Sequence, residues 1–288
     1  MKKLKQKIVK ELKGKTILIT GGAGSVGTYL TKKILEYPIK QVRIIDINEH
    51  GLFLLNRNLQ DSRIRLLLGD INDKERIEMA GKGVDIVIHI AAIKNVEISE
   101  YNPIETIESN VNGTVNLIKM TMKNKPKKFL TISTDKAVDS STLYGATKLL
   151  AERITSWAGV HLNPPTKFAV ARFGNVIETR GNVFEVWKDE LKNGKPLSIT
   201  DPKMERFFFH VDEATEFILD CLPMMNKGEI FIPKMKLKNV KDLANKISKK
   251  QKIIGLRKGE KLQEKLLTED EKKIVIEKPS FFIIRQNE

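Results

Sequence analysis

The sequence predicts an α/β fold with a doubly wound parallel sheet and a smaller C-terminal α+β lobe. Short runs of β-branched residues alternate with helical stretches as far as Phe173, and βαβ units of this kind build parallel sheets. Beyond Phe173 the alternation stops, and shorter helices and strands follow in mixed order. We therefore expect a basic helix at residues 1–13, a main domain at residues 14–173 and a smaller lobe at residues 174–288.

Six short runs rich in aliphatic residues have the length and composition of buried strands. They lie at residues 16–20, 42–46, 64–69, 85–90, 129–133 and 168–172. Helical stretches follow the first five runs, near residues 26–36, 50–59, 73–80, 104–123 and 144–158. In the C-terminal part, helices are predicted near residues 182–193, 212–224 and 240–249, and strands near residues 229–232, 252–255 and 281–284.

The composition of the 288 residues, 41% hydrophobic and 30% charged, is that of a globular protein. The longest nearly uncharged apolar stretch, residues 86–93, is far shorter than a membrane-spanning helix, and the N-terminus lacks the apolar core of a signal peptide. Cys221 is the only cysteine, which excludes an intramolecular disulfide and a multi-cysteine zinc site. We expect a cytoplasmic protein with no transmembrane segment and no metal site.

The net charge of +15 raises the question of a nucleic-acid partner. The Lys and Arg residues are scattered and aromatic residues make up only 6% of the chain, so no stretch combines basic with stacking side chains. Residues 1–15 form the one dense basic run, in which Leu4, Ile8 and Leu12 define an apolar stripe. We favour a helix that packs on the domain edge or in an oligomer over one that binds an anionic membrane. No nucleic-acid partner is predicted.

A glycine-rich turn, residues 20–27 (TGGAGSVG), follows the first strand directly and opens the first helix. Its first glycine allows a tight turn, the second lets the backbone approach a pyrophosphate, and the third lets helix and strand pack closely. The N-terminus of the helix then faces the phosphates. The order of strand, turn and helix predicts a Rossmann-like domain that binds a dinucleotide. The cofactor-binding residues expected here are Gly21, Gly24, Ser25, Val26 and Gly27.

Asp46 ends the second predicted strand, where a carboxylate can accept a hydrogen bond from the adenosine ribose and repel a 2′-phosphate. This position favours NAD over NADP as the cofactor. Arg43 lies within the strand and Arg57 is distant in sequence, so neither is placed to bind a 2′-phosphate. The alternative role of Asp46 is that of a helix N-cap.

Tyr144 and Lys148 lie four residues apart at the start of a predicted helix, so their side chains share one face. They follow residues 133–136 (STDK) at the carboxyl end of the fifth strand, the edge at which open α/β sheets bind ligands. A nearby ammonium and a positive cofactor ring lower the pKa of a tyrosine, which can then take a proton from a substrate hydroxyl as hydride leaves that carbon. The alternative is an aromatic side chain that only anchors the helix.

Together these motifs resemble those of extended short-chain dehydrogenase/reductases that act on nucleotide sugars. The glycine turn, residues 89–92 (HIAA), Asn110 and the Tyr144/Lys148 pair carry this resemblance. The match is closer still to UDP-N-acetylglucosamine 4,6-dehydratases. It rests on six ordered blocks: STDKAV (133–138), LYGATK (143–148), RFGNV (172–176), ITDPKMERFF (199–208), EIFIPK (229–234) and IIGLRKGEKLQE (253–264). The resemblance spans about residues 14–285.

The resemblance implies five catalytic residues. Thr134 would hydrogen-bond the sugar 4-hydroxyl while Tyr144 removes its proton and hydride passes from C4 to the nicotinamide; Lys148 would hold the ribose and keep Tyr144 acidic. Lys136 would be the base for the C5 hydrogen and Asp135 the acid for the departing 6-hydroxyl, before hydride returns to C6. Adjacent charges are more often a solvated ion pair. Adjacent strand residues also point to opposite faces, so both reach one sugar only if the chain has turned into a loop.

The resemblance also implies residues that bind the cofactor and the substrate, UDP-N-acetylglucosamine or a related UDP-sugar. Besides the glycine turn and Asp46, the residues expected at the cofactor are Asp70, Ile71, Ala91, Ala92, Lys94, Asn110, Tyr144 and Lys148. Those expected to hold the UDP-sugar are Lys94, Asn175, Val176, Arg206, Arg257 and Glu260. Arginine suits a diphosphate because its planar fork makes bidentate contacts. A homo-oligomer built through packed helices is expected as well.

The sequence departs from the family pattern at residues 139–142, where DSST replaces the usual NP-x-N before YGATK. Tyr144, the short chain and the block IIGLRKGEK resemble the soluble, 5-inverting form, which leads to pseudaminic-acid-type sugars. Asp46 and the helix after it instead resemble the membrane-anchored group.

Two other functions remain open: a UDP-sugar 4-epimerase, and a catalytically silent basic protein that binds nucleic acid or a membrane through residues 1–15. An epimerase needs no acid for water loss, so Asp135 with Lys136 favours the dehydratase. Intact Thr134, Tyr144 and Lys148 speak against a silent protein.

Overall fold

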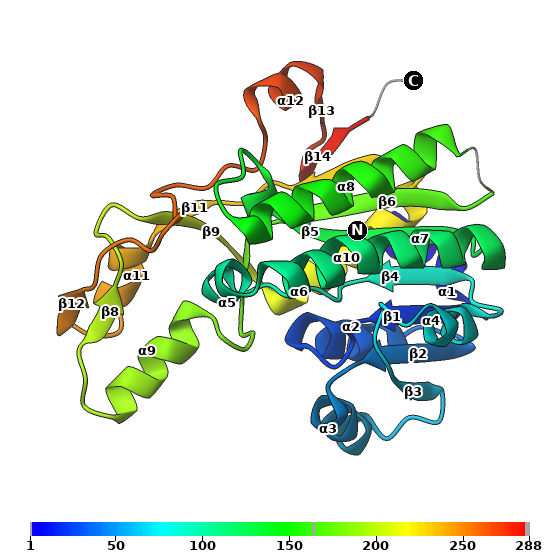
Figure 1. Cartoon of the computed structure of the whole chain (residues 1–288), viewed down its shortest axis with the longest axis horizontal. Coiled ribbons are helices and arrows are strands. Elements are labelled where there is room, and N and C mark those ends of the chain that lie inside the picture. Colours follow the sequence, from blue (N-terminus) through cyan, green and yellow to red (C-terminus); the bar gives the residue numbers. More distant parts are fainter. Residues whose placement is uncertain (1, 163–164, 286–288) are drawn as a thin grey trace.

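Among residues 2–162 and 165–285, which the computed structural model describes, the core is a nine-stranded sheet. Its strands are β1 (Thr16–Thr20), β2 (Gln41–Asp46), β3 (Ile64–Leu68), β4 (Ile86–His89), β5 (Lys128–Thr134), β6 (Lys167–Phe173), β10 (Glu229–Pro233), β13 (Ile276–Glu277) and β14 (Phe281–Ile284). Their spatial order is β13-β14-β10-β6-β5-β4-β1-β2-β3 (Figure 1). The six strands predicted for the main domain are all present, with ends that differ by at most one residue.

The sheet has the topology of a doubly wound Rossmann fold, which confirms the predicted fold class. The strands from β3 to β10 run parallel, whereas β14 and β13 continue the sheet antiparallel. The order of the strands reverses between β1 and β4. A ligand crevice forms at such a reversal, outside the carboxyl ends of the strands. The topology therefore places the expected site beside the ends of β1, β4 and β5.

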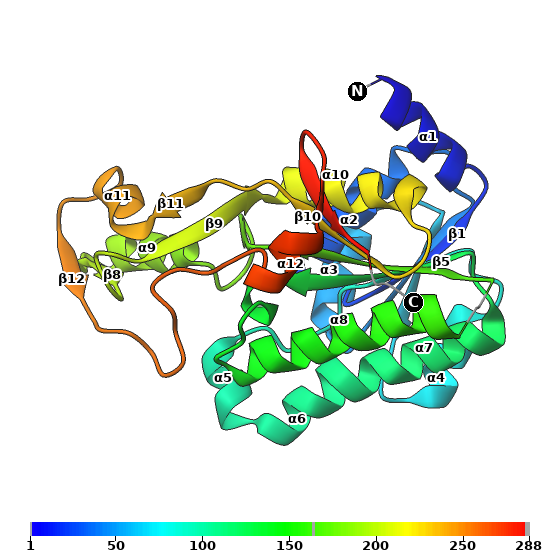
Figure 2. The same cartoon turned by 90° about the horizontal axis from the view of Figure 1, so that it is seen from above.

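Helices cover both faces of the sheet, as Figure 2 shows. On one face pack α1 (Lys2–Leu12), α2 (Ser25–Leu35), α3 (Glu49–Leu59) and α10 (Val211–Cys221). On the other face pack α4 (Lys74–Gly81), α7 (Gly113–Asn124) and α8 (Leu143–His161). The strand β1 is buried along its whole length: Ile17 and Ile19 join the core of the first face and Leu18 that of the second. A strand covered on both faces needs this continuous apolar run.

The basic helix α1 packs on the domain through the apolar stripe that the sequence predicts. Ile8 and Leu12 are buried in the main core, and Leu4 packs against it. Glu11 forms an ion pair with Lys128 of β5 at 2.6 Å. The stripe is thus used inside the chain, as expected for a helix on the domain edge. No helix in the described part of the chain is long and apolar enough to cross a membrane.

The segment before β5 differs from the single helix expected at residues 104–123. The structure has α5 (Val96–Tyr101), α6 (Pro103–Ile107), a π-helical turn at Glu108–Asn112 and then α7. Asn95 begins α5 by accepting a hydrogen bond from the Ile98 N–H, and a proline at the first position begins α6. The short polar α5 escaped prediction because it has no extended apolar period.

The C-terminal lobe contains several short strands, of which only β12 overlaps a predicted one, near residues 252–255. A small sheet joins β7 (Asn175–Ile177), β9 (Glu205–His210) and β11 (Leu237–Asn239), and β8 (Leu197–Ile199) pairs with β12 (Gln251–Ile253). The helices of the lobe are α9 (Val183–Lys192), α11 (Val240–Asn245) and α12 (Glu269–Ile274). Its core centres on Trp187, whose side chain is fully buried. The chain then returns to the main sheet through β14.

Candidate active site

The glycine turn lies between β1 and α2, and its glycines are set by close backbone contacts. Gly21 has a φ of +68°, and a Cβ atom there would lie 2.6 Å from the Ala91 nitrogen. A Cβ atom at Gly27 would lie 2.4 Å from the Gly22 Cα atom. At Gly24 a Cβ atom would meet only the Gly21 oxygen, at 3.1 Å. The turn is therefore closed on its inner side and leaves the backbone at Gly24 open to a ligand.

The N-terminus of α2 offers hydrogen-bond donors at this open side. Gly24 is the N-cap of α2 and provides no side-chain cap, so the first helical N–H groups, from Ser25 to Gly27, receive no partner from it. Free donors at a helix N-terminus bind phosphate groups. The turn and helix start therefore fit the pyrophosphate of a dinucleotide.

Asp46 lies beside the same turn, at the end of β2. One carboxylate oxygen accepts a hydrogen bond from the Ala23 N–H and the other from the Asn48 N–H, both at 2.9 Å. The N-cap of α3 is Asn48, which accepts from the Gly51 N–H, so the alternative role of Asp46 as an N-cap is wrong. The carboxylate instead ties the glycine turn to the residues that follow β2.

The expected adenine neighbours follow β3. Asp70 is exposed and accepts a hydrogen bond from the Asn72 N–H at 2.8 Å. Ile71 is buried, and a Cβ atom at Gly113 would lie 2.4 Å from its Cδ1 atom. The side chain of Ile71 is thus part of the core under α7, and Asp70 is the exposed group at this edge.

Behind the crevice, a buried histidine connects β1, β4 and α7. His89 Nδ1 lies 2.7 Å from the Thr20 hydroxyl, and His89 Nε2 lies 3.0 Å from the Thr114 hydroxyl. Burial, together with the charge of Lys148, lowers the pKa of His89 to about 3. His89 is therefore neutral near pH 7 and serves as a hydrogen-bonded spacer. The sequence marked the HIAA block without assigning this role to its first residue.

Asn110 fixes the loop that carries Ala91, Ala92 and Lys94. Its side chain accepts a hydrogen bond from the Ile93 N–H at 2.8 Å and donates to the Ile93 carbonyl at 3.0 Å and to the Thr147 hydroxyl at 3.0 Å. Asn110 is itself buried and lies in the π-helical turn. The structure thus gives Asn110 a role in positioning the loop.

Tyr144 and Lys148 lie at the start of α8, next to the end of β5. Thr142, the last residue of the DSST departure, caps α8 by accepting a hydrogen bond from the Gly145 N–H at 3.1 Å. A Cβ atom at Gly145 would lie 2.2 Å from the Lys136 carbonyl oxygen, so this glycine lets α8 approach the STDK block. The departure from the family pattern therefore still places Tyr144 beside Thr134.

Burial is the largest influence on the pKa values of Tyr144 and Lys148 in the protein by itself. Burial raises the pKa of Tyr144 above its usual range; a hydrogen bond with Thr134 opposes this, and the charge of Asp135 adds to it. Burial also lowers the pKa of Lys148 to about 8, against the attraction of Glu152. In the protein by itself, removal from water outweighs the neighbouring groups, so the lowered pKa expected for Tyr144 depends on the positive cofactor ring as well as on Lys148.

The STDK block turns into a loop, as the chemistry requires. Residues 135–137 form one 3-10 turn directly after β5, which ends at Thr134. The Thr134 hydroxyl donates to Asp135 Oδ1 at 2.9 Å, and Lys136 Nζ donates to the same oxygen at 3.1 Å. Asp135 is fully buried and Lys136 is partly exposed. The pair is therefore not a solvated surface ion pair.

The residues expected to hold the UDP-sugar line one cavity of about 490 Å³, together with Lys136. The members of this set are Lys94, Asn175, Val176, Arg206, Arg257 and Glu260. Asn175 Oδ1 accepts a hydrogen bond from Lys136 Nζ at 3.4 Å, which ties the cavity to the catalytic pair. The structure thus brings these residues together from the loop after β4, from β7 and β9, and from the segment after β12.

The two arginines of the cavity differ in burial and in how far contacts within the chain already occupy their guanidinium groups. Arg206 is buried and donates to the carbonyl oxygens of Glu205, Lys261 and Leu262 at 2.7 to 3.0 Å. Arg257 is half-exposed and pairs with Glu97 at 2.8 Å. The guanidinium of Arg257 is thus the more available of the two for a diphosphate, and Arg206 holds the segment beside it.

Arg180 approaches the glycine turn from the C-terminal lobe and was missed in the sequence. Its Nη2 atom donates to the Ala23 carbonyl at 2.8 Å, and its N–H donates to the Ser25 hydroxyl at 2.9 Å. Its own carbonyl accepts a hydrogen bond from Lys94 Nζ at 3.1 Å. Arg180 therefore connects the glycine turn to the cavity-lining Lys94, and its bond to Ser25 spans more than 150 residues of sequence.

Comparison with known proteins shows the family to which the chain belongs. A family model described as "Polysaccharide biosynthesis protein" matches residues 17–286. The chain belongs to this family. Within the family's fold, a solved structure of Pen from Bacillus thuringiensis superimposes with a TM-score of 0.92 at 36% sequence identity, and the match covers 95% of this chain and 90% of that one. The predicted family is confirmed.

Curated relatives of the family match over most of their length. The "Uncharacterized membrane protein MJ1061" of Methanocaldococcus jannaschii is 43% identical over 90% of this chain and 82% of its own. A UDP-N-acetylglucosamine 4,6-dehydratase (inverting) of Campylobacter jejuni is 39% identical over 94% of this chain and 83% of its own. A UDP-glucose 4-epimerase of Rickettsia bellii is 34% identical over 89% of this chain and 79% of its own.

Proposed function

We propose that the protein is a UDP-N-acetylglucosamine 4,6-dehydratase. The reaction oxidises C4 of the sugar, eliminates water across C5 and C6 and reduces C6, which gives a UDP-4-keto-6-deoxy-N-acetylhexosamine. The observation that carries the proposal is the Asp135–Lys136 pair beside Tyr144, because elimination needs an acid and a base that C4 oxidation alone does not need. The dehydratase relative from Campylobacter jejuni supports the same reaction.

The residues around the glycine turn fit a nicotinamide dinucleotide. When bound, this cofactor supplies the acceptor and then the donor of the hydride. The N–H groups at Ser25 and Val26 would bind its phosphates, and Asp46 the adenosine ribose. The carboxylate at that position favours NAD over NADP. In this proposal residues 14–173 mainly bind the cofactor and residues 174–288 mainly bind the UDP-sugar.

Oxidation at C4 uses Thr134, Tyr144 and Lys148. Thr134, hydrogen-bonded to both Tyr144 and Asp135, orients the 4-hydroxyl, and Tyr144 accepts its proton. Because burial holds the pKa of Tyr144 high, a positive charge nearby must support its loss of a proton. Lys148 supplies that charge below about pH 8.

Elimination uses the pair in the loop after β5. The 4-ketone makes the C5 hydrogen acidic, and Lys136, as the free amine, takes it. Asp135, as the carboxylic acid, gives its proton to the 6-hydroxyl, which leaves as water. The resting ion pair converts to this reactive state when one proton moves from Lys136 to Asp135 across their 3.1 Å contact.

A UDP-sugar 4-epimerase remains the second candidate, since the Rickettsia bellii relative carries that name. An epimerase would use Tyr144 and Lys148 in the same way and would leave the 6-hydroxyl in place. The burial of Asp135 next to Lys136 favours the dehydratase, because an unneeded buried charge pair costs desolvation free energy.

The deciding experiment is turnover of UDP-N-acetylglucosamine with NAD, followed by NMR. A 4-keto-6-deoxy product is expected. A 4-epimer that retains the C6 oxygen would overturn the proposal in favour of the epimerase.

Three finer points belong to the same proposal. Inversion at C5 is supported by Tyr144, by the IIGLRKGEK block and by the relative named as inverting, and it would lead toward pseudaminic-acid-type sugars. A homo-oligomer is supported by exposed apolar side chains on α5, α6 and α8. A cytoplasmic location is supported by the single, buried and free Cys221.

A further inference from the structure

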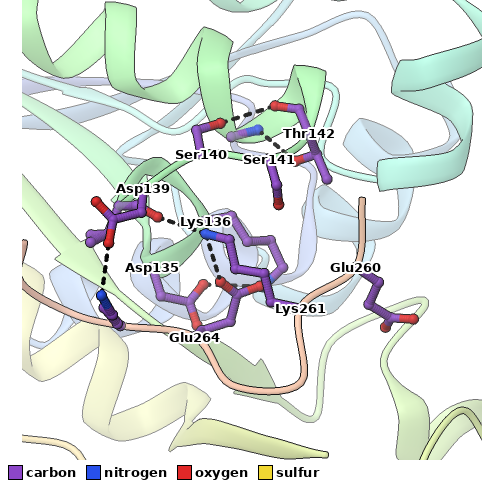
Figure 3. Close-up of polar contacts among 12 residues, drawn as sticks. Asp135, Lys136, Asp139, Ser140, Ser141, Thr142, Glu260, Lys261 and Glu264 are labelled. Atoms are coloured by element: carbon purple, nitrogen blue, oxygen red, sulfur yellow. Dashed lines mark hydrogen bonds and ion pairs between the residues drawn. The ribbon is translucent and has the colours of Figure 1, made fainter. Parts of the chain in front are cut away.

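A second carboxylate, Glu264, lies against the Asp135–Lys136 pair. Glu264 Oε1 is 4.0 Å from Lys136 Nζ, on a segment that follows β12 and is more than 120 residues away in sequence. Figure 3 shows the side chains of Asp135, Lys136 and Glu264 directed toward one another. Lys136 thus has two carboxylate neighbours, one from its own loop and one from the C-terminal segment.

Both carboxylates are buried and incompletely satisfied. Glu264 is 5% exposed and Asp135 is fully buried. Glu264 Oε2 and Asp135 Oδ2 have no hydrogen-bond partner among the described residues. Buried polar atoms rarely lack partners, and such exceptions often mark sites where a ligand completes the bonding. Glu264 lines the cavity beside Lys136, and Asp135 lies behind Lys136, to which it is hydrogen-bonded.

The backbone around Glu264 is held on both sides. Before it, Arg206 binds the carbonyls of Lys261 and Leu262. After it, the buried Arg172 donates to the Leu266 carbonyl at 3.1 Å. These contacts fix the segment from its two ends, so the position of Glu264 is built into the lobe.

The charge of Glu264 has its own partner. Lys261 Nζ lies 3.6 Å from Glu264 Oε2 and donates to the Val138 carbonyl at 2.9 Å. Around the cavity wall two carboxylates therefore face two ammonium groups, those of Lys136 and Lys261. The group as a whole is neutral, which lowers the cost of its burial.

We propose that Glu264 is a positioning residue for the elimination step, which rests on the function proposed above. Asp135 and Lys136, the proposed acid and base, are adjacent residues whose side chains bind each other at 3.1 Å. While Asp135 holds the Lys136 side chain, the amine cannot reach C5. Glu264 competes with Asp135 for the Lys136 side chain. It holds the amine on the cavity side when Asp135 turns to the 6-hydroxyl.

The step balances without any further reactant. The C5–H proton moves to the Lys136 amine, and the electron pair of that bond forms the C5–C6 double bond as the C6–O bond breaks. The hydroxyl leaves as water with the proton of Asp135. Lys136 becomes an ammonium and Asp135 a carboxylate. Glu264 keeps its charge throughout and holds the new ammonium near C5, so that the proton can return to that carbon.

The test is Glu264→Gln, which keeps the shape and removes the charge. Turnover of UDP-N-acetylglucosamine is expected to fall roughly 10- to 100-fold, with KM changed by less than about threefold. In a single turnover the absorbance of reduced nicotinamide should accumulate, because C4 is still oxidised while elimination is slow. Exchange of the C5 hydrogen in deuterium oxide should slow in proportion. Glu264→Asp, which keeps the charge, should recover part of the rate.

The matched control is Glu269→Gln, an exposed carboxylate on α12 of the same segment, which should behave as wild type. Wild-type turnover in Glu264→Gln, or equal loss of C4 oxidation and of elimination, would overturn the inference. If Glu264→Gln does not fold, the same two rates in Glu264→Asp decide instead. A wild-type protein that forms no 4-keto-6-deoxy product would instead overturn the proposed function, so the two failures are distinct.

Discussion

At the scale of single residues, burial has more influence than neighbouring charge on protonation in this site. It raises the pKa of Tyr144, lowers that of Lys148 to about 8 and lowers that of His89 to about 3. Sequence motifs place charges near one another along the chain, but they do not show how much water remains around them. The acidity expected of Tyr144 therefore depends on the positive cofactor ring as well as on Lys148.

His89→Gln should change how stability depends on pH. The pKa of His89 is about 3 in the folded chain and 6.5 as its ordinary value, so the unfolded chain binds the extra proton between these limits. Stability should therefore fall as pH falls through this window, by up to about 1.4 kcal/mol per pH unit from this group. Urea unfolding between about pH 4 and 7 should show a shallower loss for His89→Gln.

The exposed His161 offers a matched control for that experiment. His161→Gln should keep the wild-type pH dependence. If His89→Gln also keeps it, another group accounts for the acid sensitivity.

Lys136→Ala should abolish dehydration and leave NAD bound. Loss of a general base costs roughly 10²- to 10⁴-fold in rate. The glycine turn contains no contact with Lys136, so NAD binding measured by calorimetry should stay at the wild-type level. Lys265→Ala, which removes an exposed ion pair with Asp139, is the control and should stay active. Full turnover in Lys136→Ala would remove Lys136 from its role as base.

At the scale of secondary-structure elements, the glycine turn contains one glycine that we expect the fold to need, Gly27, and one that we expect cofactor binding to need, Gly24. Gly27→Ala should destabilise the fold by about 1–3 kcal/mol or more, because its Cβ would lie 2.4 Å from the Gly22 Cα atom. Gly24→Ala should fold normally, since its φ is −71° and its Cβ would meet only the Gly21 oxygen. It should still weaken NAD binding by roughly tenfold, about 1.4 kcal/mol.

Urea unfolding and calorimetric titration with NAD distinguish the two glycine variants. Equal loss of stability in both would mean that Gly24 is structural. Unchanged NAD affinity in Gly24→Ala would mean that the cofactor does not approach the turn there.

The elements of the main domain were predictable, whereas those of the C-terminal lobe were only partly so. The strands β1, β4 and β5 are buried along their whole length, and β6 is buried except at its first residue, so their sequences are rich in apolar residues. The strands β7, β8 and β11, which were not predicted, have three residues each, too few to establish a period of two. Tertiary pairing determines such strands.

The same limit applies to Glu264. In sequence it ends the charged stretch RKGEKLQE and looks like a surface residue. In the structure Arg206 and Arg172 fix the backbone near it, and its side chain is buried beside Lys136. Only the folded lobe brings these residues together, so no local pattern could reveal the contact.

At the scale of the whole molecule, the net charge of +15 gives little information about the partner. The informative cations are single residues in particular places: Lys136 beside a buried acid, Lys148 in the crevice and Arg257 at the cavity. The remaining positive charge is spread over the surface, where it can steer an anionic UDP-sugar toward the protein. Placement within the fold, rather than total charge, indicates the substrate class.

The proposed self-association rests on the helices beside the candidate site. Tyr101 on α5 is 88% exposed and Ile104 on α6 is 70% exposed, and Leu150 and Trp157 on α8 are half-exposed. Large apolar side chains on neighbouring helices mark interaction surfaces. In Figure 2 these helices lie together along one side of the molecule, next to α7. A symmetric contact would pair this surface with the same surface of a second copy.

The wild-type protein should therefore sediment as a dimer or larger oligomer, and Tyr101→Asp with Ile104→Asp should shift it toward the monomer. Met79→Asp, at an exposed apolar residue of α4, is the matched control and should keep the wild-type mass. Because α8 carries Tyr144 and packs against α5 and α6, loss of the contact should also lower turnover. A monomeric wild type in analytical ultracentrifugation would contradict the proposal, since the exposed side chains of α5 and α6 would then have no partner copy.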